Sequence, residues 1–312
     1  MRASYLVRMK RRILTPLMIP GIIALMQLQM SAQGCSDAGF CTIPGLKPGH
    51  ELMDTPPNSL EIGVAYGSAD NDISVISPFI EYTRRLSGQF DLSAKLTMLG
   101  QNGNDISVFG VSDLYLTGNY AINSTSHATL GVKIPLSDGN TSEDGLPLPM
   151  DYQSSLGTFD LIVGYGYQMG KFQLSAGYQQ PLSQNKNTFF AEAYPEGSPI
   201  RDFQSTNAFK RKGDILVRAA YPFVIGESLT LTPSLLPIYH LGEDSYVDAA
   251  GAEQSIDGSD GLTLNVNAYL DYRIKSKHLI RLSVGFPVVV RDTRPDGLTR
   301  SFIAALSYGI DF

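Results

Sequence analysis

Tryptophan is absent from this chain of 312 residues, and cysteine and histidine are scarce, with two and four residues respectively. The two cysteines, Cys35 and Cys41, have no histidine near them in the sequence, so they do not complete a tetrahedral zinc site. In an oxidising compartment they can close a small loop, and we expect a structural disulfide between them. We expect no cofactor.

Basic residues are outnumbered by acidic ones, with 24 Lys and Arg against 30 Asp and Glu, so the formal net charge is −6. Five of the cations lie in residues 1–32, which hold no acid, and removing that stretch takes the charge to −11. Nucleic acid is therefore not an expected partner, because phosphate backbones select for Lys and Arg.

The first residues predict an exported protein. A cationic start is followed by an apolar run over 13–28 and by Ser31-Ala32, which is the layout of a secretory signal peptide. The apolar run is interrupted by Pro16 and Pro20, which argues against a membrane anchor. A lipoprotein is the alternative because Cys35 follows, but the aliphatic residue usual three positions before a lipidated cysteine is missing. We expect a signal peptide over 1–32.

Helical periodicity is also missing, since apolar residues recur at every second position after residue 58. From Phe90 to Met98, for example, apolar residues alternate with Asp91, Ser93, Lys95 and Thr97. About twelve segments share this pattern, with lengths suited to tilted transmembrane strands. They lie near 59–67, 73–84, 89–99, 107–121, 127–137, 157–168, 171–182, 213–223, 228–240, 261–274, 278–290 and 300–312.

The connections between these segments alternate in length. Those after the even-numbered strands are short, whereas those after the fifth, seventh and ninth are long and polar. This alternation is typical of an outer-membrane barrel with short periplasmic turns and long extracellular loops. The last segment alternates up to a terminal aromatic residue, and Tyr308 and Phe312 resemble the signal that the outer-membrane insertion machinery reads.

The predicted fold is therefore all-β, a transmembrane up-and-down antiparallel barrel of about twelve strands over residues 59–312. Ten or fourteen strands are the alternatives, because 183–212 could contain a further hairpin. The bacterial outer membrane is the expected location, with its lipids and lipopolysaccharide as partners. Residues 33–58, rich in Pro and Gly, would form a plug in the barrel or a periplasmic tail.

In such a barrel the polar face of each strand lines the lumen. Both charge signs are present on it in similar number, whereas a general anion or cation pore would favour one sign. A salt-bridged interior that stabilises the barrel is the alternative to a selectivity track. The predicted lumen-lining residues are Glu61, Glu81, Asp91, Lys95, Asp113, Lys133, Asp160, Arg218, Asp271, Arg273 and Arg281.

Two prolines mark a possible opening in the barrel wall. Pro78 and Pro287 each remove a ladder hydrogen bond close to the seam where the first and last strands meet. One hypothesis is a lateral gate there for an apolar substrate, and the alternative is a harmless kink at the rim.

The loop over 241–260 contains six acidic residues and no Lys or Arg. Oxygen ligands of this kind suit Ca²⁺, with Asp257 and Asp260 as weak candidates, although a solvated acidic loop is the commoner interpretation. His240, with Asp244 and Ser245 beside it, is the candidate base for an outer-membrane lipid hydrolase, but its surroundings do not reproduce that family's spacing. We expect no enzyme.

Three consecutive strands resemble a known family. Residues 109–116 (FGVSDLYL), 130–137 (LGVKIPLS) and 157–164 (GTFDLIVG) follow the order seen in outer-membrane transporters associated with the meta-pathway of phenol degradation. The family's Lys-x-Pro-Thr-Gly element reads Lys-Ile-Pro-Leu-Ser here. The resemblance implies a relation to fatty-acid-transporter-like barrels, which take up hydrophobic compounds and whose N-terminal segment plugs the lumen.

The first functional hypothesis is therefore passive uptake of a small hydrophobic or aromatic compound. The second is a structural or adhesive surface barrel whose acidic loops bind partners. The third is a lipid-modifying enzyme.

Overall fold

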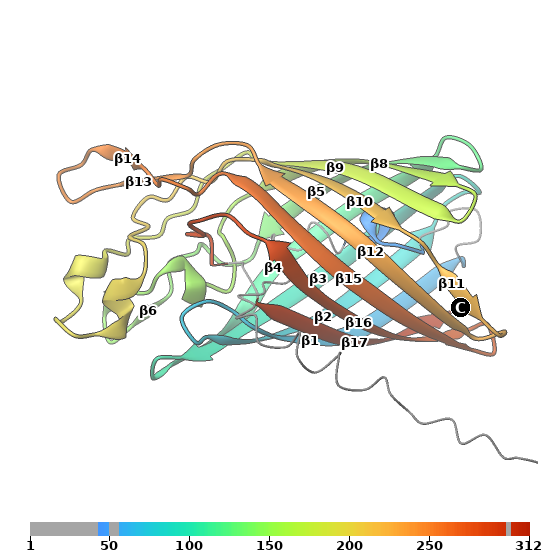
Figure 1. Cartoon of the computed structure of the whole chain (residues 1–312), viewed down its shortest axis with the longest axis horizontal. Helices are drawn as coiled ribbons and strands as arrows, with labels where there is room; N and C mark the ends of the chain where they lie inside the picture. Colours follow the sequence, from blue (N-terminus) through green and yellow to red (C-terminus); the bar gives the residue numbers. More distant parts are fainter. Residues whose placement is uncertain (1–42, 50–55, 298–300) are drawn as a thin grey trace, which may run out of the picture. The chain divides into compact units, whose positions relative to one another are not determined.

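The computed structural model describes residues 43–49, 56–297 and 301–312. The expected signal peptide and the expected disulfide lie outside these residues. One large antiparallel sheet dominates the fold (Figure 1). Its strands are β1 (Asn58–Ser68), β2 (Ser74–Arg85), β3 (Phe90–Gly103), β4 (Ile106–Ala121), β5 (Ser126–Pro135), β8 (Asp160–Met169), β9 (Phe172–Pro181), β10 (Asp214–Ala220), β11 (Phe223–Ile225), β12 (Leu229–His240), β15 (Gly261–Ile274), β16 (His278–Val289) and β17 (Phe302–Asp311).

The sheet closes into a barrel. β1 pairs with β17 over an unbroken run from Ser59↔Asp311 to Ser68↔Phe302, and β10 pairs with both β9 and β12. β10 and β11 both pair with β12 and are two parts of one strand, interrupted at Tyr221 and Pro222. Thirteen elements thus form a barrel of twelve strands, as the sequence predicts.

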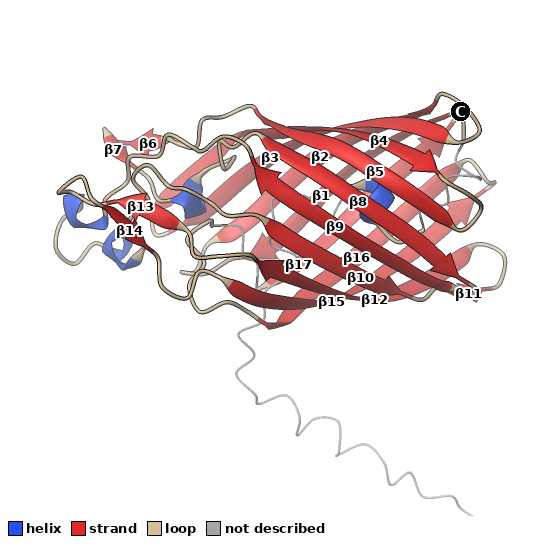
Figure 2. Cartoon of the chain, turned by 90° about the horizontal axis from the view of Figure 1, so that it is seen from above, coloured by secondary structure: helices blue, strands red, loops and turns tan. Residues whose placement is uncertain are grey.

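The short turns that follow the even-numbered strands lie at one end of the barrel, and the long loops lie at the other (Figure 2). Short turns occupy 86–89, 122–125, 170–171, 226–228 and 275–277. At the other end the two-residue hairpin Asn104-Asp105 has φ of 53° and 62°, which suits the right-handed twist of the strands it joins. The long connections 136–159, 182–213 and 241–260 share that end. Short turns face the periplasm in this class of barrel, so this second end faces outward.

The long loops carry small elements of their own. A short hairpin of β6 (Ser142–Glu143) and β7 (Leu146–Pro147) precedes the 3₁₀ helix η4 (Met150–Tyr152), and β13 (Ser245–Val247) pairs with β14 (Glu253–Ser255). The loop that could have hidden a hairpin contains two 3₁₀ helices, η5 (Ala191–Ala193) and η6 (Pro199–Asp202), and no strand in its described residues. The count of twelve therefore holds against the alternatives.

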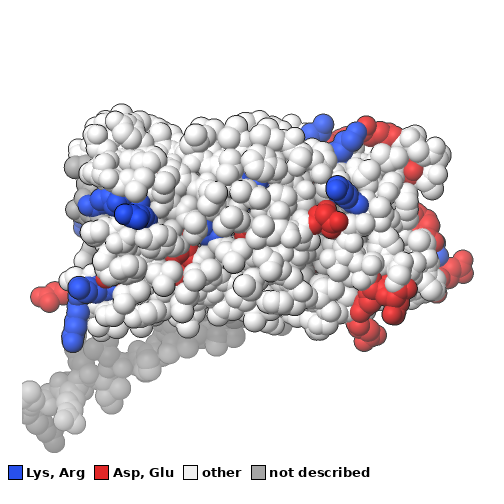
Figure 3. All heavy atoms as spheres, turned by 180° about the vertical axis from the view of Figure 1, so that it is seen from behind, with Lys and Arg blue, Asp and Glu red and all other residues white. Residues whose placement is uncertain are grey.

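The outer surface of the barrel is apolar. On β1, Ile62, Val64 and Tyr66 are exposed while the residues between them face inward. On the face in Figure 3, Lys and Arg gather at the end with the short turns, Asp and Glu predominate at the loop end, and the middle is nearly uncharged. Exposed tyrosines occur on most strands. An uncharged band between polar ends is the surface that a bilayer requires, and the protein is an outer-membrane barrel.

Among the described residues, no helix has the length and apolar character needed to cross a membrane.

A short 3₁₀ helix, η2 (Pro44–Leu46), lies inside the barrel nearer the end with the short turns (Figures 1 and 2). Ile43 and Leu46 pack in a buried cluster with inward-facing residues of β4, β8, β10 and β12, including Tyr115 and Ile162. Residues 43–49 therefore lie inside the barrel, and the role of the N-terminal segment as a plug stays a prediction.

Candidate functional site

The lumen contains a cavity of about 210 Å³ above η2. Small residues on the seam strands make room for it, among them Ala65, Gly67 and Ala305. Gly63 is also needed, since a Cβ there would lie 2.6 Å from the ring of Phe79 and 2.8 Å from Ser307. The ring of Phe79 can therefore lie across β1 and form part of the cavity wall.

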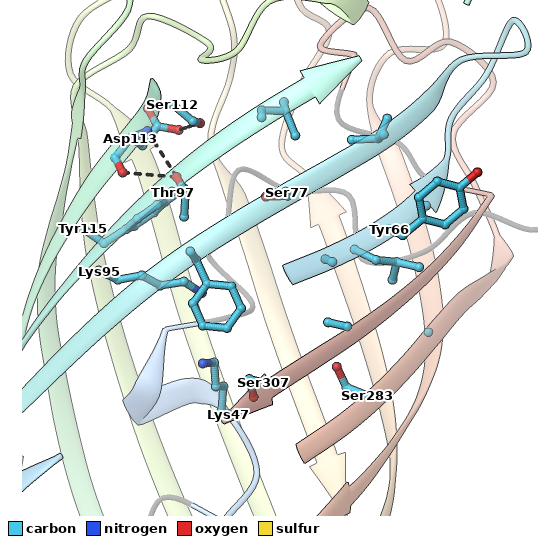
Figure 4. Close-up of a pocket in the computed structure, with 18 of the residues that line it drawn as sticks. Lys47, Tyr66, Ser77, Lys95, Thr97, Ser112, Asp113, Tyr115, Ser283 and Ser307 are labelled. Atoms are coloured by element: carbon cyan, nitrogen blue, oxygen red, sulfur yellow. Dashed lines mark hydrogen bonds between the residues drawn. The ribbon is translucent and has the colours of Figure 1, made fainter. Parts of the chain in front are cut away.

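Two lysines and one aromatic ring form the floor of this cavity (Figure 4). The Nζ of Lys47 is 3.2 Å from Glu81 Oε2, and the Nζ of Lys95 is 3.9 Å from the same oxygen. Both ammonium groups also approach the face of Phe79, at 4.5 Å for Lys95 and 5.8 Å for Lys47. Each cation is thus stabilised by a carboxylate and a π system together.

The opposite wall holds a second ion pair. Arg281 donates to the two carboxylate oxygens of Asp271 from Nε at 2.6 Å and from NH2 at 2.8 Å, and its guanidinium lies 6.0 Å from the ring of Tyr269. Glu61 also lines the cavity. The pair of Arg281 and Asp271 is bidentate, so each of the two side chains neutralises and orients the other.

The upper wall is polar, and Asp113 is one of its charged residues (Figure 4). Asp296 of the loop 290–297 also lines the cavity. The carboxylate of Asp113 accepts hydrogen bonds from Ser155 Oγ at 2.7 Å and from Ser112 Oγ at 2.9 Å. Thr97 Oγ1 bonds the backbone of the same aspartate. Val75, Leu99, Leu156 and Ile303 supply apolar surface beside these groups.

The structure places the eleven predicted lumen residues in three settings. Seven are buried, namely Glu81, Asp91, Lys95, Asp113, Lys133, Asp160 and Arg218. Glu61 and Arg281 are half-buried at the cavity, and Asp271 is half-buried beside Arg281. Arg273 lies at the turn end with half of its side chain exposed and pairs with Asp311 at 3.2 Å. Asp91 accepts a hydrogen bond from Asn119 at 2.7 Å. The interior is therefore salt-bridged, as the structural alternative predicts, and part of it also lines the cavity.

Residues 43–49 are held inside the barrel by side chains of the wall. Arg218 donates to the carbonyl of Leu46, His127 Nε2 lies 2.8 Å from the carbonyl of Gly45, and the N–H of Gly49 donates to Gln173 at 2.9 Å. A Cβ on Gly45 would lie 2.2 Å from both Asn119 and Thr129, so only glycine fits there. Lys47, which sequence reasoning missed, contributes a charge to the cavity from this segment.

The prolines do not open the seam. Pro78 pairs with Val64 of β1, and the interruption it causes is on its other side, where Ser77 and Pro78 have no ladder partners in β3. Pro287 lies at a register shift between β16 and β15. The β1–β17 ladder is unbroken, and the two prolines mark irregularities in the neighbouring ladders, so a lateral gate at the seam stays a prediction.

In the described part of the chain, His240 and Ser245, the residues considered for a hydrolase, bond to other partners. Both ring nitrogens of His240 contact carboxylates, Asp214 and Asp244, and the Ser245 hydroxyl donates to Glu253 at 2.7 Å. In the described ranges, no cluster of three or more His, Cys, Asp or Glu is suited to a metal, and the calcium candidate in the acidic loop stays a prediction. Asp257 and Asp260 are exposed.

No family model and no curated protein matches the chain, so the family resemblance of the three strands stays a prediction. Among solved structures, the COG4313 outer membrane channel from Pseudomonas putida F1 is similar, with a TM-score of 0.59 and 14% identity over 85% of this chain and 99% of that one. A KdgM porin and the CymD monoaromatic hydrocarbon channel also align, both with TM-scores of 0.43, at 10% and 8% identity. The porin match covers 81% of this chain and 99% of that one, and the CymD match 90% and 94%. Of these three structures, only the COG4313 channel has a TM-score above 0.5, and its similarity shows that the two chains share the barrel fold.

Proposed function

We propose that this barrel is a channel for small, uncharged, partly apolar molecules, with single-ring aromatic compounds as the substrate class. The observation that carries the proposal is the cavity inside a closed barrel, about 210 Å³ in volume. An engineered apolar cavity of about 150 Å³ holds one benzene molecule, so this space suits a substituted single ring.

The lining favours a neutral solute. Lys47, Lys95 and Arg281 are each held by a carboxylate, so a charged solute would have to compete with pairs already formed. The aliphatic wall of Val75, Leu99, Leu156 and Ile303 offers apolar contact. Hydroxyl groups of Ser77 and Ser283 offer hydrogen bonds to one polar substituent.

Residues 43–49 act as a plug that limits the flux of solute through the barrel. Residues 43–49 lie in the lumen below the cavity, bound by Arg218 and by His127. Flux through the resting protein is therefore limited, and displacement of this segment would widen the path.

Three ring-matched compounds test the proposal: benzyl alcohol, benzoate and benzylammonium. Their entry into vesicles with a lipopolysaccharide outer leaflet is measured with the full chain, with a chain lacking 33–57, and without protein. For each compound, the rate of entry with protein is compared with the rate into protein-free vesicles. We expect the largest protein-dependent increase for benzyl alcohol, and a still larger increase with the chain lacking 33–57. Equal rates for a charged analogue would contradict the selectivity. No protein-dependent flux with either chain would contradict the channel and favour a structural or adhesive barrel.

A further inference from the structure

A cluster of buried charges joins the outer ends of β10 and β12 to the long loops. His240, the last residue of β12, is 1% exposed. Its Nδ1 lies 2.7 Å from Oδ1 of Asp214, the first residue of β10, and its Nε2 lies 2.8 Å from Oδ1 of Asp244 in the loop 241–260. The imidazole is thus held at both nitrogens by carboxylates from different elements.

This geometry assigns the protonation state. An ionised carboxylate can only accept hydrogen bonds, whereas a neutral imidazole has one donor and one acceptor nitrogen. Two carboxylates at hydrogen-bond distance from both nitrogens therefore require the imidazolium. The backbone N–H of Lys212 also donates to Asp244, at 2.9 Å, so that carboxylate is already ordered as an acceptor.

Two arginines extend the cluster to the loop 290–297. Arg211 NH1 is 2.6 Å from Asp214, and its Nε is 3.4 Å from Asp296. Arg291 NH2 is 2.9 Å from Asp296, and its NH1 donates to the carbonyl of Ser259 at 2.7 Å. Within the described residues, three carboxylates thus face two guanidiniums and one imidazolium, so loss of the His240 proton removes one positive charge from a buried site.

We propose that His240 is a pH-sensitive latch that holds the outer loops 182–213, 241–260 and 290–297 over the lumen and releases them on deprotonation. The latch borders the path, because Asp296 lines the lumen cavity. A neutral imidazole can donate to Asp214 or to Asp244 but not to both, so one carboxylate then faces a lone pair. A buried charge without its partner is costly, and separating the loops relieves that cost by admitting water.

The mobility of a spin label on the loop 241–260 tests the latch directly. Ala249→Cys places the label on an exposed position, in a background carrying Cys35→Ser and Cys41→Ser. Between about pH 5 and pH 10, which spans histidine titration, we expect mobility to rise with pH. With His240→Gln it should be high throughout. Lys210→Gln is the matched control, since it removes an exposed pair with Glu253 at 2.6 Å between the same loops and should keep the pH response. A label whose mobility does not change with pH would overturn the latch.

Conductance across planar bilayers is the second measurement, and it rests on the proposed channel. We expect a severalfold rise with pH that a disulfide between Lys210→Cys and Ser245→Cys abolishes and a reductant restores. These positions are partners in an isolated antiparallel bridge, at a separation that suits a disulfide. A label that responds to pH in a protein that never conducts would support the latch and contradict the channel. Conductance that rises equally in the oxidised tether would contradict the latch.

Discussion

Lys133 and Asp160 stand directly opposite one another on β5 and β8, and their side chains form an ion pair of 3.0 Å with both groups fully buried. Lys133 also donates to Thr158 at 2.9 Å, and Asp160 accepts from Gln179. The pair is therefore embedded in further hydrogen bonds that fix both side chains in the barrel interior.

Breaking this pair from one side should destabilise the barrel. We expect Lys133→Met to lower the free energy of unfolding by about 3–5 kcal/mol, because it leaves a buried carboxylate without its cation. The double variant with Asp160→Leu should recover much of that loss. Urea unfolding in lipid vesicles measures both, and a double variant less stable than the single one would contradict the interpretation.

Displacing the plug through Gly45 should open the lumen. A Cβ at position 45 would lie 2.2 Å from side-chain atoms of Asn119 and Thr129, so the side chain of Gly45→Val should displace the segment. We therefore expect conductance to rise toward that of the chain lacking 33–57. Gly88→Val is the matched control, since a Cβ at Gly88 meets nothing within 4 Å. Unchanged conductance in the Gly45 variant would show that the segment does not obstruct ion flow.

Neutralising Glu81 should change ion selectivity. Its carboxylate is shared by Lys47 and Lys95, so Glu81→Gln removes the negative charge between two cations at the cavity floor. We expect the reversal potential in a salt gradient to shift toward anion selectivity. Glu253→Gln, at an exposed loop pair, should leave it unchanged. A shift of the same size in both variants would assign the effect to surface charge.

The stability of the protein should depend on pH through Asp296, which lies in the outer loop 290–297. Burial by itself would raise the pKa of this carboxyl, but the guanidiniums of Arg291 and Arg211 overcome that effect and hold the pKa well below its usual range. A lowered folded-state pKa means that the stabilisation is complete above the ordinary carboxyl pKa and is lost as pH falls through the lowered value. We expect Asp296→Asn to cost about 1.5–3 kcal/mol at neutral pH. Urea unfolding should show the two proteins converging only in strong acid, and convergence already in mild acid would contradict the assignment.

Strand positions were predictable because a membrane barrel must alternate apolar and polar residues along every strand. The expected segment 107–121 became β4 (Ile106–Ala121), and 261–274 became β15. Residues such as Lys95 and Asp113 could be assigned to the inner face by parity alone. Their partners could not, since Lys95 meets Glu81 through strand register and Asp113 meets Ser155 through the folding of a long loop.

Loop structure and the plug contacts were beyond sequence reasoning for a different reason. No periodicity links Lys47 to Glu81 or Gly45 to Asn119, and these contacts depend on a segment folding back into the lumen. His240 was visible as a candidate base, but its bonds to Asp214 and Asp244 arise where β10 and a long loop meet.

The sequence by itself determined the barrel, its twelve strands, its inward charges and its two unlike ends, because each follows from period-two alternation and loop length. Only the tertiary structure decided which charges neutralise one another, where a cavity remains and that the β1–β17 seam is closed. Those features depend on register and on distances across the lumen, which local sequence does not encode.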